Sequence, residues 1–268
     1  MGLRINSTSP ALEAQRQLGQ RAQELTRNFE GLSSALRINR SRDDAAGLAI
    51  AERLRADIRQ LGRETGNIQS GIGVVQTAEG GLSAQQGVVN RLQELALQAS
   101  SGTLTDDQRA AINTEAQELV GELDQIADNT EFNNIAPLQG LGPIDLGVED
   151  GLEVSVQQST AASLGLSGLD LGTQAGAQAA LGGIAAASDA IAENRANLGA
   201  QQNTFETAIA TRQDTAVNLQ EAESRIRDLD IASAAIERTR NEVLLQSAAS
   251  SVIQGNIVPQ TAARLLGG

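Results

Sequence analysis

The 268-residue sequence lacks histidine, cysteine, lysine, tryptophan and tyrosine, and it has only three phenylalanines. Nucleophilic, zinc-dependent and general-base chemistry usually relies on one of these missing side chains. Carboxylates remain, but among thirty-three acidic residues adjacent pairs such as Asp43-Asp44 arise by chance. Without cysteine there is also no disulfide framework. This composition argues against an enzyme, and we expect neither a cofactor nor a metal site.

Long hydrophobic runs are absent as well. Residues 1–6 contain no apolar core of the kind found in a cleaved signal peptide. The longest wholly apolar runs span only a few residues, far below the ~20 needed to cross a bilayer. We therefore expect a chain that is soluble when made, with no cleaved signal and no membrane partner.

Positive charge is scarce in the middle of the chain. Residues 101–195 carry two arginines against fifteen acidic residues, which accounts for the whole net charge of −13. An acidic surface disfavours nucleic acid, because phosphates are bound by basic side chains. We expect no nucleic-acid partner and interpret the acidic middle as a solvated outer face.

Heptad periodicity is the strongest pattern that the sequence does contain. Between Ile184 and Ile236, apolar residues recur every seven positions and again three places later. The seam keeps its register through five polar interruptions, which are Asn194, Gln201, Arg212, Thr215 and Ser233. The pattern predicts a continuous helix in a coiled coil of about seven repeats, and such a helix needs helical partners.

Three further amphipathic helices are expected before residue 130. The first begins at Ser9-Pro10 and carries an apolar seam formed by Leu18, Ala22, Leu25, Phe29, Leu32 and Leu36. The second covers residues 44–99 despite several glycines, each costing roughly 1 kcal/mol relative to alanine, so packing must hold it. The third starts with a capping box at Thr105-Asp-Asp-Gln108.

The helical period disappears between about residues 129 and 173. Leu152, Val154 and Val156 alternate there with polar residues, which predicts a short strand or hairpin at the tip of a helical rod. A last helix is expected to end at Val258-Pro259, because proline cannot continue the backbone hydrogen bonding. The predicted fold class is mainly α: an elongated helical bundle or coiled coil of N- and C-terminal helices with a small β-hairpin region at the tip.

Several motifs resemble those of bacterial flagellins. The N-terminal half carries Leu32-Ser-Ser-Ala-Leu-Arg-Ile-Asn39, Asp43-Asp-Ala-Ala-Gly47, Gln76-Thr-Ala-Glu-Gly80, Arg91-Leu-Gln-Glu-Leu-Ala-Leu-Gln98 and Glu131-Phe-Asn133. The C-terminal half carries Leu198-Gly-Ala-Gln-Gln-Asn203, Phe205, Ser224-Arg-Ile226 and the stretch from Leu245-Gln246 to Val258-Pro-Gln260. The likeness covers residues 1–138 and 180–268 in the family's order and spacing. One departure is Ala35, which stands where the family usually has glycine.

The resemblance implies two domains. Paired termini, residues 1–43 and 229–268, would form an inner coiled-coil domain, and residues 44–228 a rod-like helical bundle with a short β or irregular segment at about 129–173. About forty residues separate the two similar halves, so the chain looks like a short flagellin without the outer variable domains. Each terminal seam buries little apolar surface alone, so we expect residues 1 to about 42 and 229–268 to be disordered in the free monomer.

The resemblance also implies how the chain assembles. Its partners would be further copies in a helical filament, the flagellar type III export apparatus, an export chaperone and a cap protein, and it would be secreted into the extracellular flagellum. The residues expected to carry filament assembly are Leu18, Ala22, Leu25, Phe29, Leu32, Leu36, Leu229, Ile236, Leu245 and Val252.

One more surface resembles the site at which the flagellin-sensing Toll-like receptor recognises its ligands. The matching positions are Arg91, Leu95 and Glu115. Packing within a bundle accounts equally well for Leu95, and solvated charges or a pair between subunits account for Arg91 and Glu115. Both interpretations stay open at the level of sequence.

Three other functions compete with a filament subunit. A hook-filament junction protein shares flagellin-like termini, although the complete Arg91–Gln98 and Val258–Gln260 motifs favour a flagellin. A coiled-coil signalling rod, such as a chemoreceptor cytoplasmic bundle, would need transmembrane anchors that the sequence lacks. An enzyme is disfavoured by the missing histidine, cysteine, lysine and tyrosine.

Overall fold

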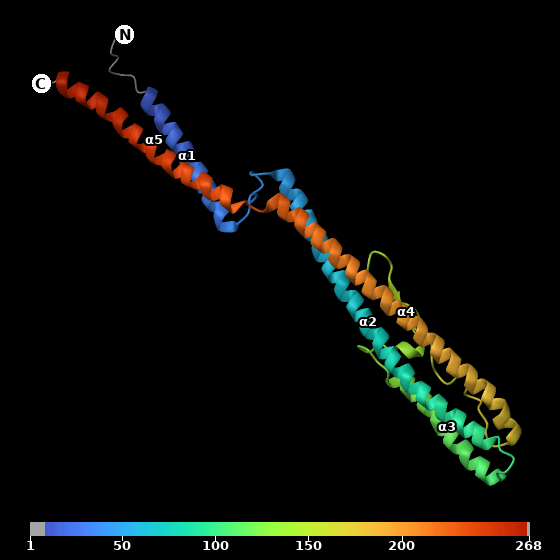
Figure 1. The fold of residues 1–268 in the computed structure, drawn as a ribbon. Coiled ribbons are helices and arrows are strands. Elements are labelled where there is room, and N and C mark those ends of the chain that lie inside the picture. Colours follow the sequence, from blue (N-terminus) through green and yellow to red (C-terminus); the bar gives the residue numbers. More distant parts are fainter. Residues whose placement is uncertain (1–8, 267–268) are drawn as a thin grey trace. The chain divides into compact units, whose positions relative to one another are not determined.

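A computed structural model describes the backbone of residues 9–266 and the side chains of residues 12–254. The described part contains five α-helices, which are α1 (Ser9–Ser34), α2 (Ala45–Ala99), α3 (Asp106–Asn129), α4 (Gln174–Arg227) and α5 (Ile231–Leu266). Between α3 and α4 lie a short 3-10 helix, η1 (Pro137–Gln139), and two strands, β1 (Ile144–Asp145) and β2 (Glu153–Val154) (Figure 1). The strands pair antiparallel, with Ile144 opposite Val154. The predicted fold class, mainly α with a small hairpin, is confirmed.

The chain forms two compact units. The terminal unit comprises residues 1–58 and 217–268, and the bundle unit comprises residues 59–216. Helices α2 and α4 contribute residues to both units. The division into filament domains at residues 43/44 and 228/229 stays a prediction.

The core of the bundle unit is built from the predicted faces of α2, α3 and α4. On α4, the buried side chains follow the heptad seam from Ile184 to Arg212, with Phe205 as the largest. On α2, the side chains buried at helical spacing are Val75, Ala78, Leu82, Val89, Leu92, Ala96 and Ala99. Each buried leucine or phenylalanine stabilises the fold by about 1.5–3 kcal/mol relative to exposure. The start of α3 is capped as predicted, because Thr105 Oγ1 accepts from the Gln108 amide and Gln108 Oε1 accepts from the Thr105 amide.

The glycines of α2 have two different roles. At Gly81, an added Cβ would lie 2.5 Å from Thr130 Oγ1 and 2.7 Å from Leu138 Cδ1, so only glycine lets the irregular segment approach the helix. Gly71 and Gly73 are similarly crowded by side chains of that segment. No neighbouring atom lies within 4 Å of such a Cβ at Gly80. Packing therefore explains some of these glycines but not all of them.

Polar residues on the heptad seam of α4 hold the irregular segment. Asn194 accepts from the amide of Gln157 and donates to its carbonyl oxygen at 2.9 Å. One heptad later, Gln201 makes the same pair of hydrogen bonds with the backbone of Ser155, at 3.0 and 2.7 Å. The seam thus provides a ladder of side-chain amides for an extended strand segment.

Two predictions about the C-terminal helices are wrong. The heptad seam does not run through one helix to Ile236, because α4 ends at Arg227 and α5 begins at Ile231. Asp230 causes the break: its carboxylate accepts from the amides of Ala232 and Ser233 and so caps a new helix. The expected end at Val258-Pro259 is also wrong, since α5 continues to Leu266. Proline removes one hydrogen bond, which can kink a helix without ending it.

Candidate assembly surface

In the terminal unit, α1 and α5 pack along each other (Figure 1). The half-buried side chains of α1 are spaced by three and four residues at Leu18, Arg21, Leu25, Asn28 and Leu32. The matching face of α5 is formed by Ala234, Arg238, Asn241, Leu245, Ala248 and Val252. This spacing is that of a coiled-coil seam, but both helices place polar residues in it.

The predicted assembly residues fall into two groups. Seven are half-buried within the terminal unit, namely Leu18, Leu25, Leu32, Leu36, Leu229, Leu245 and Val252. The other three, Ala22, Phe29 and Ile236, are exposed. On α1, Arg21 and Asn28 take the inward positions that the sequence pattern gave to Ala22 and Phe29.

The described part of α5 carries several exposed apolar side chains. Ile236 is 70% exposed and Val243, one heptad later, is 58% exposed. Ile231 and Ile253 on the same helix are more than half exposed as well. Ile236 continues the heptad register of α4, although it lies on α5. Because the cap at Asp230 starts a new helix, this register no longer lies on the side of the helix that packs against α1. We call the pair Ile236 and Val243, which share one face of the helix, the outer seam of α5.

The segment between α1 and α2, residues 35–44, joins the terminal helices through backbone contacts. The amide of Arg37 donates to Arg227 O at 2.7 Å, and the amide of Leu229 donates to Ala35 O at 3.0 Å. Leu36 and Asp228 form an isolated antiparallel bridge between these two bonds. This contact fixes the register of α1 against α5. The sequence pattern, which assigned Leu36 to a helical seam, did not predict it.

The motif Asp43-Asp-Ala-Ala-Gly47 forms the start of α2. Asp44 Oδ1 accepts from the amide of Gly47 at 2.8 Å, and a Cβ at Gly47 would lie 2.9 Å from the buried Ile38. Asp43 accepts from the amides of Arg40 and Asn39, at 2.9 and 3.3 Å. The hydrogen bond from Arg40, followed by that from Asn39, lowers the pKa of Asp43.

Ion pairs add to the contacts of the terminal unit. Arg227 lies 3.1 Å from Glu52, and Arg55 lies 3.1 Å from Glu223. The guanidinium of Arg238 stacks 4.7 Å above the centroid of the Phe29 ring, where a cation is attracted by the ring face. These contacts link α1, α2, α4 and α5 within the terminal unit.

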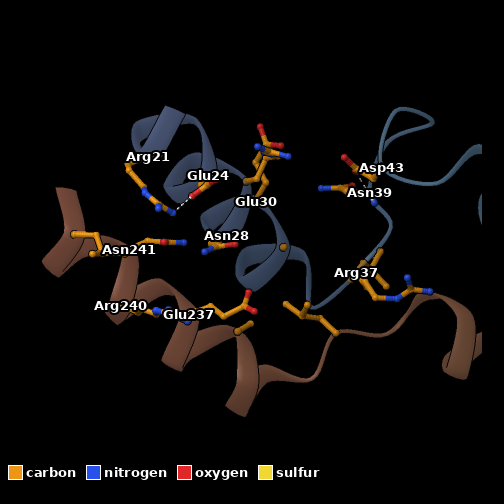
Figure 2. Close-up of a pocket in the computed structure, with 16 residues that line it drawn as sticks. Arg21, Glu24, Asn28, Glu30, Arg37, Asn39, Asp43, Glu237, Arg240 and Asn241 are labelled. Carbon is orange, nitrogen blue, oxygen red and sulfur yellow. Dashed lines mark hydrogen bonds and ion pairs between the residues drawn. The ribbon is translucent and has the colours of Figure 1, made fainter. Parts of the chain in front are cut away.

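A polar cavity of about 590 Å³ lies between α1, residues 35–44 and α5 (Figure 2). Its charged lining is balanced, with the arginines Arg21, Arg27, Arg37 and Arg240 facing the acids Glu24, Glu30, Asp43 and Glu237. Balanced charges do not select an anion or a cation. Such a lining suits ion pairs with a complementary protein surface better than a small ligand.

The residues predicted to contact a receptor occupy two different environments. Arg91 is exposed and donates to Glu115 Oε1 at 2.8 and 3.1 Å and to Glu94 Oε2 at 2.8 Å. The hydrogen bond to Glu115 is the main reason that the pKa of Arg91 is raised. Leu95 is only 2% exposed and lies in the bundle core. Receptor contact at these three positions stays a prediction, and of the three side chains only Arg91 and Glu115 are exposed in the single chain.

The described residues contain neither a candidate metal cluster nor a candidate membrane-spanning helix. Among them, no three histidine, cysteine, aspartate or glutamate side chains gather where they could hold a metal ion. No helix in the same part of the chain is long and apolar enough to cross a membrane.

Paired terminal helices and a bundle of long helices place the chain in the class of mainly helical, coiled-coil-like proteins. Comparison with known proteins identifies the family. The family model described as the bacterial flagellin N-terminal helical region matches residues 5–142, and that of the flagellin C-terminal helical region matches residues 181–266. The chain belongs to the bacterial flagellin family.

Relatives match over almost their full length. A flagellin of Halalkalibacterium halodurans is 39% identical across 98% of this chain and 99% of its own. Flagellin FlaB2 of Treponema pallidum is 35% identical with the same coverage. A solved flagellar hook-associated structure from Vibrio parahaemolyticus, only 12% identical, shares the fold with a TM-score of 0.59 over 69% of this chain and all of its own.

Proposed function

We propose that this chain is a structural subunit of the bacterial flagellar filament and assembles with further copies through its terminal helices. One observation carries the proposal: α5 is apolar on two sides, and α1 covers only one of them. Ile236 and Val243 remain more than half exposed in the single chain. Contiguous apolar surface of this kind marks a protein interface. The relatives named flagellin and flagellar filament core protein support filament assembly as its use.

The seam residues have two roles in this proposal. Leu18, Leu25, Leu32, Leu36, Leu229, Leu245 and Val252 join α1 to α5, while Ala22, Phe29 and Ile236 contact neighbouring copies. Because these contacts are completed only in the filament, the termini would be disordered in the free monomer and fold on assembly. A head-to-tail contact that does not close into a ring produces an open helical filament.

Export and location follow the flagellin resemblance. We propose that the chain leaves the cell unfolded through the flagellar type III export apparatus, with an export chaperone, and is added under a cap protein to the extracellular filament. Limited proteolysis of monomer tests the disorder that this route requires. Rapid cleavage confined to both ends is expected, and protection of both ends would contradict it.

Recognition by the flagellin-sensing Toll-like receptor is proposed for the surface around Arg91 and Glu115. Both side chains are exposed and already form an ion pair, which presents a fixed pattern of charge to a partner. A hook-filament junction protein remains the alternative function, because a flagellar hook-associated protein has the same fold. Long self-assembled filaments would separate a flagellin from a junction protein.

Replacement of the outer seam tests the assembly proposal. In the double variant Ile236→Ser/Val243→Ser, filament formation by purified protein should fall sharply, because the subunit contact loses apolar area worth roughly 25 cal/mol per Å². Leu141→Ser is the matched control, since Leu141 is also exposed, at 63%, but lies in the bundle unit. Sedimentation measures the polymerised fraction. Equal polymerisation of the double variant and the control would contradict the role of the outer seam.

A further inference from the structure

The turn between β1 and β2 contains the only aspartate in the sequence that is followed by glycine, Asp150-Gly151. No asparagine in the sequence precedes a glycine. This dipeptide is chemically vulnerable, because glycine has no Cβ to hinder attack of its own nitrogen on the preceding carboxyl group. The turn belongs to the bundle unit, and the side chain of Asp150 is 71% exposed to water.

Both reacting groups are held in the folded turn. The amide of Gly151 donates to Val148 O at 3.0 Å, so its nitrogen is directed away from the carboxyl group. Gly151 has φ of +64°, a conformation that favours glycine over other residues. The carboxylate of Asp150 accepts from Arg212 Nη2 at 2.9 Å.

Arg212 is a fixed anchor for this carboxylate. It is only 7% exposed on α4, and its Nε donates to the buried Glu64 at 3.0 Å. Because this guanidinium is buried and doubly paired, it holds its position, and in the closed turn its ion pair competes with approach of the Asp150 carboxyl group to the Gly151 nitrogen.

We propose that Asp150-Gly151 is a site of spontaneous aspartate isomerisation and that Arg212 protects it in the folded bundle. In the open turn, the Gly151 nitrogen attacks Cγ of protonated Asp150. A C–N bond forms, the nitrogen loses its proton, and a carboxyl oxygen leaves as water. Water then adds to the backbone carbonyl of the succinimide and breaks its bond to nitrogen, which leaves isoaspartate. The net reaction is an isomerisation that needs no oxidant or co-reactant.

The modification would damage the same turn. Isoaspartate routes the main chain through the side-chain carbon and lengthens it by one methylene between Val148 and β2. Two contacts lie directly after the turn in sequence. Val154 pairs with Ile144, and the backbone of Ser155 is hydrogen-bonded to the side chain of Gln201. The isoaspartate content at residue 150 therefore increases with the time that the bundle has spent open.

Peptide mapping of the full chain tests the proposal. Purified protein is incubated at neutral pH, either folded or unfolded in urea, and isoaspartate at residue 150 is quantified by mass spectrometry. We expect rapid accumulation in the unfolded chain and slow accumulation in the folded chain. In folded Arg212→Gln protein the rate should rise about fivefold, as expected for the loss of one largely exposed ion pair that keeps the turn closed.

Two further variants keep this test decisive. Arg212→Gln/Glu64→Gln avoids leaving a buried carboxylate unpaired, and circular dichroism confirms that the variant folds. Arg195→Gln is the matched control, because Arg195 lies on the same helix and pairs with Glu79 instead. No isoaspartate in either state would overturn the site, and equal rates in folded and unfolded wild-type protein would overturn its protection by the fold. A folded double variant that reacts no faster than Arg195→Gln would overturn the role of Arg212.

Discussion

At the scale of single residues, the structure gives the backbone conformation of Ala35, a position where the flagellin resemblance leads us to expect glycine. Ala35 follows α1 and has φ of +57°, in the left-handed region. For a residue with a Cβ, this conformation costs roughly 1–2 kcal/mol of free energy, and for glycine it costs much less. The strain is tolerated because the carbonyl of Ala35 accepts the amide of Leu229 and so helps to hold the terminal helices together.

Replacement of Ala35 by glycine should strengthen this contact. In assembled Ala35→Gly protein, where the terminal helices are folded, hydrogen exchange at the Leu229 amide should slow by about fivefold, the factor that corresponds to roughly 1 kcal/mol. Mass spectrometry of peptides around residue 229 measures the rate. Ala49→Gly, on an exposed position inside α2, should leave it unchanged. Unchanged or faster exchange in Ala35→Gly would show that the left-handed conformation carries no strain.

Adjacent glycines in α2 should respond in opposite directions to the same substitution. Gly81→Ala should lower the free energy of unfolding by about 1–3 kcal/mol, because its Cβ would overlap Thr130 and Leu138. Gly80→Ala should raise that free energy by up to ~1 kcal/mol, since its Cβ meets no neighbour and alanine favours the helix. Urea unfolding of both variants checks this. Similar effects at the two positions would contradict the close approach at Gly81.

At the scale of elements, sequence periodicity predicted helices well but assigned some faces wrongly. Helix α4 carries the predicted heptad seam, and its buried positions follow that seam. On α1 the same reasoning chose Ala22 and Phe29, which are exposed, whereas Arg21 and Asn28 are half-buried. Sequence periodicity identifies the buried face of a helix only when a single partner covers that helix. A helix that has partners on two sides has two apolar stripes, and the sequence does not say which one its own chain covers.

Polar residues in the α4 seam provide an element-scale test. Heptad rules alone predict that Asn194→Leu stabilises the bundle. We expect the opposite, a loss of about 1–3 kcal/mol, because the backbone of Gln157 loses both hydrogen bonds. Thr215→Leu is the control: it interrupts the same seam but is exposed, so a change within about 0.5 kcal/mol is expected. Thermal unfolding measures both, and a stabilised Asn194→Leu variant would contradict the ladder.

The breaks between elements were the hardest features to predict. The capping box at Thr105 uses side chains within four residues, so local sequence was sufficient. The cap at Asp230 is equally local, but the apolar register continued through it to Ile236 and suggested one helix. The bridge of Leu36 with Asp228 joins residues far apart in sequence, and no local pattern encodes it.

At the scale of the whole molecule, charge is divided unevenly between the two units. The terminal unit carries fourteen arginines and thirteen acidic residues, for a net charge of +1, while the bundle unit carries six arginines and twenty acidic residues, for −14. Neighbouring bundle units in a filament would repel one another, and salt screens such repulsion beyond about 8 Å at physiological ionic strength. The terminal helices, nearly neutral and apolar on two sides, are the part of the chain suited to hold copies together.

Electron microscopy of purified protein after a polymerisation trial tests the central claim most directly. We predict that the full chain forms long helical filaments and that deletion of residues 1–30 abolishes them, because α5 then loses its partner helix and the terminal unit cannot form. Filaments from the truncated chain would contradict assembly through paired terminal helices. A full chain that remains monomeric under all salt conditions would contradict its assignment as a filament subunit.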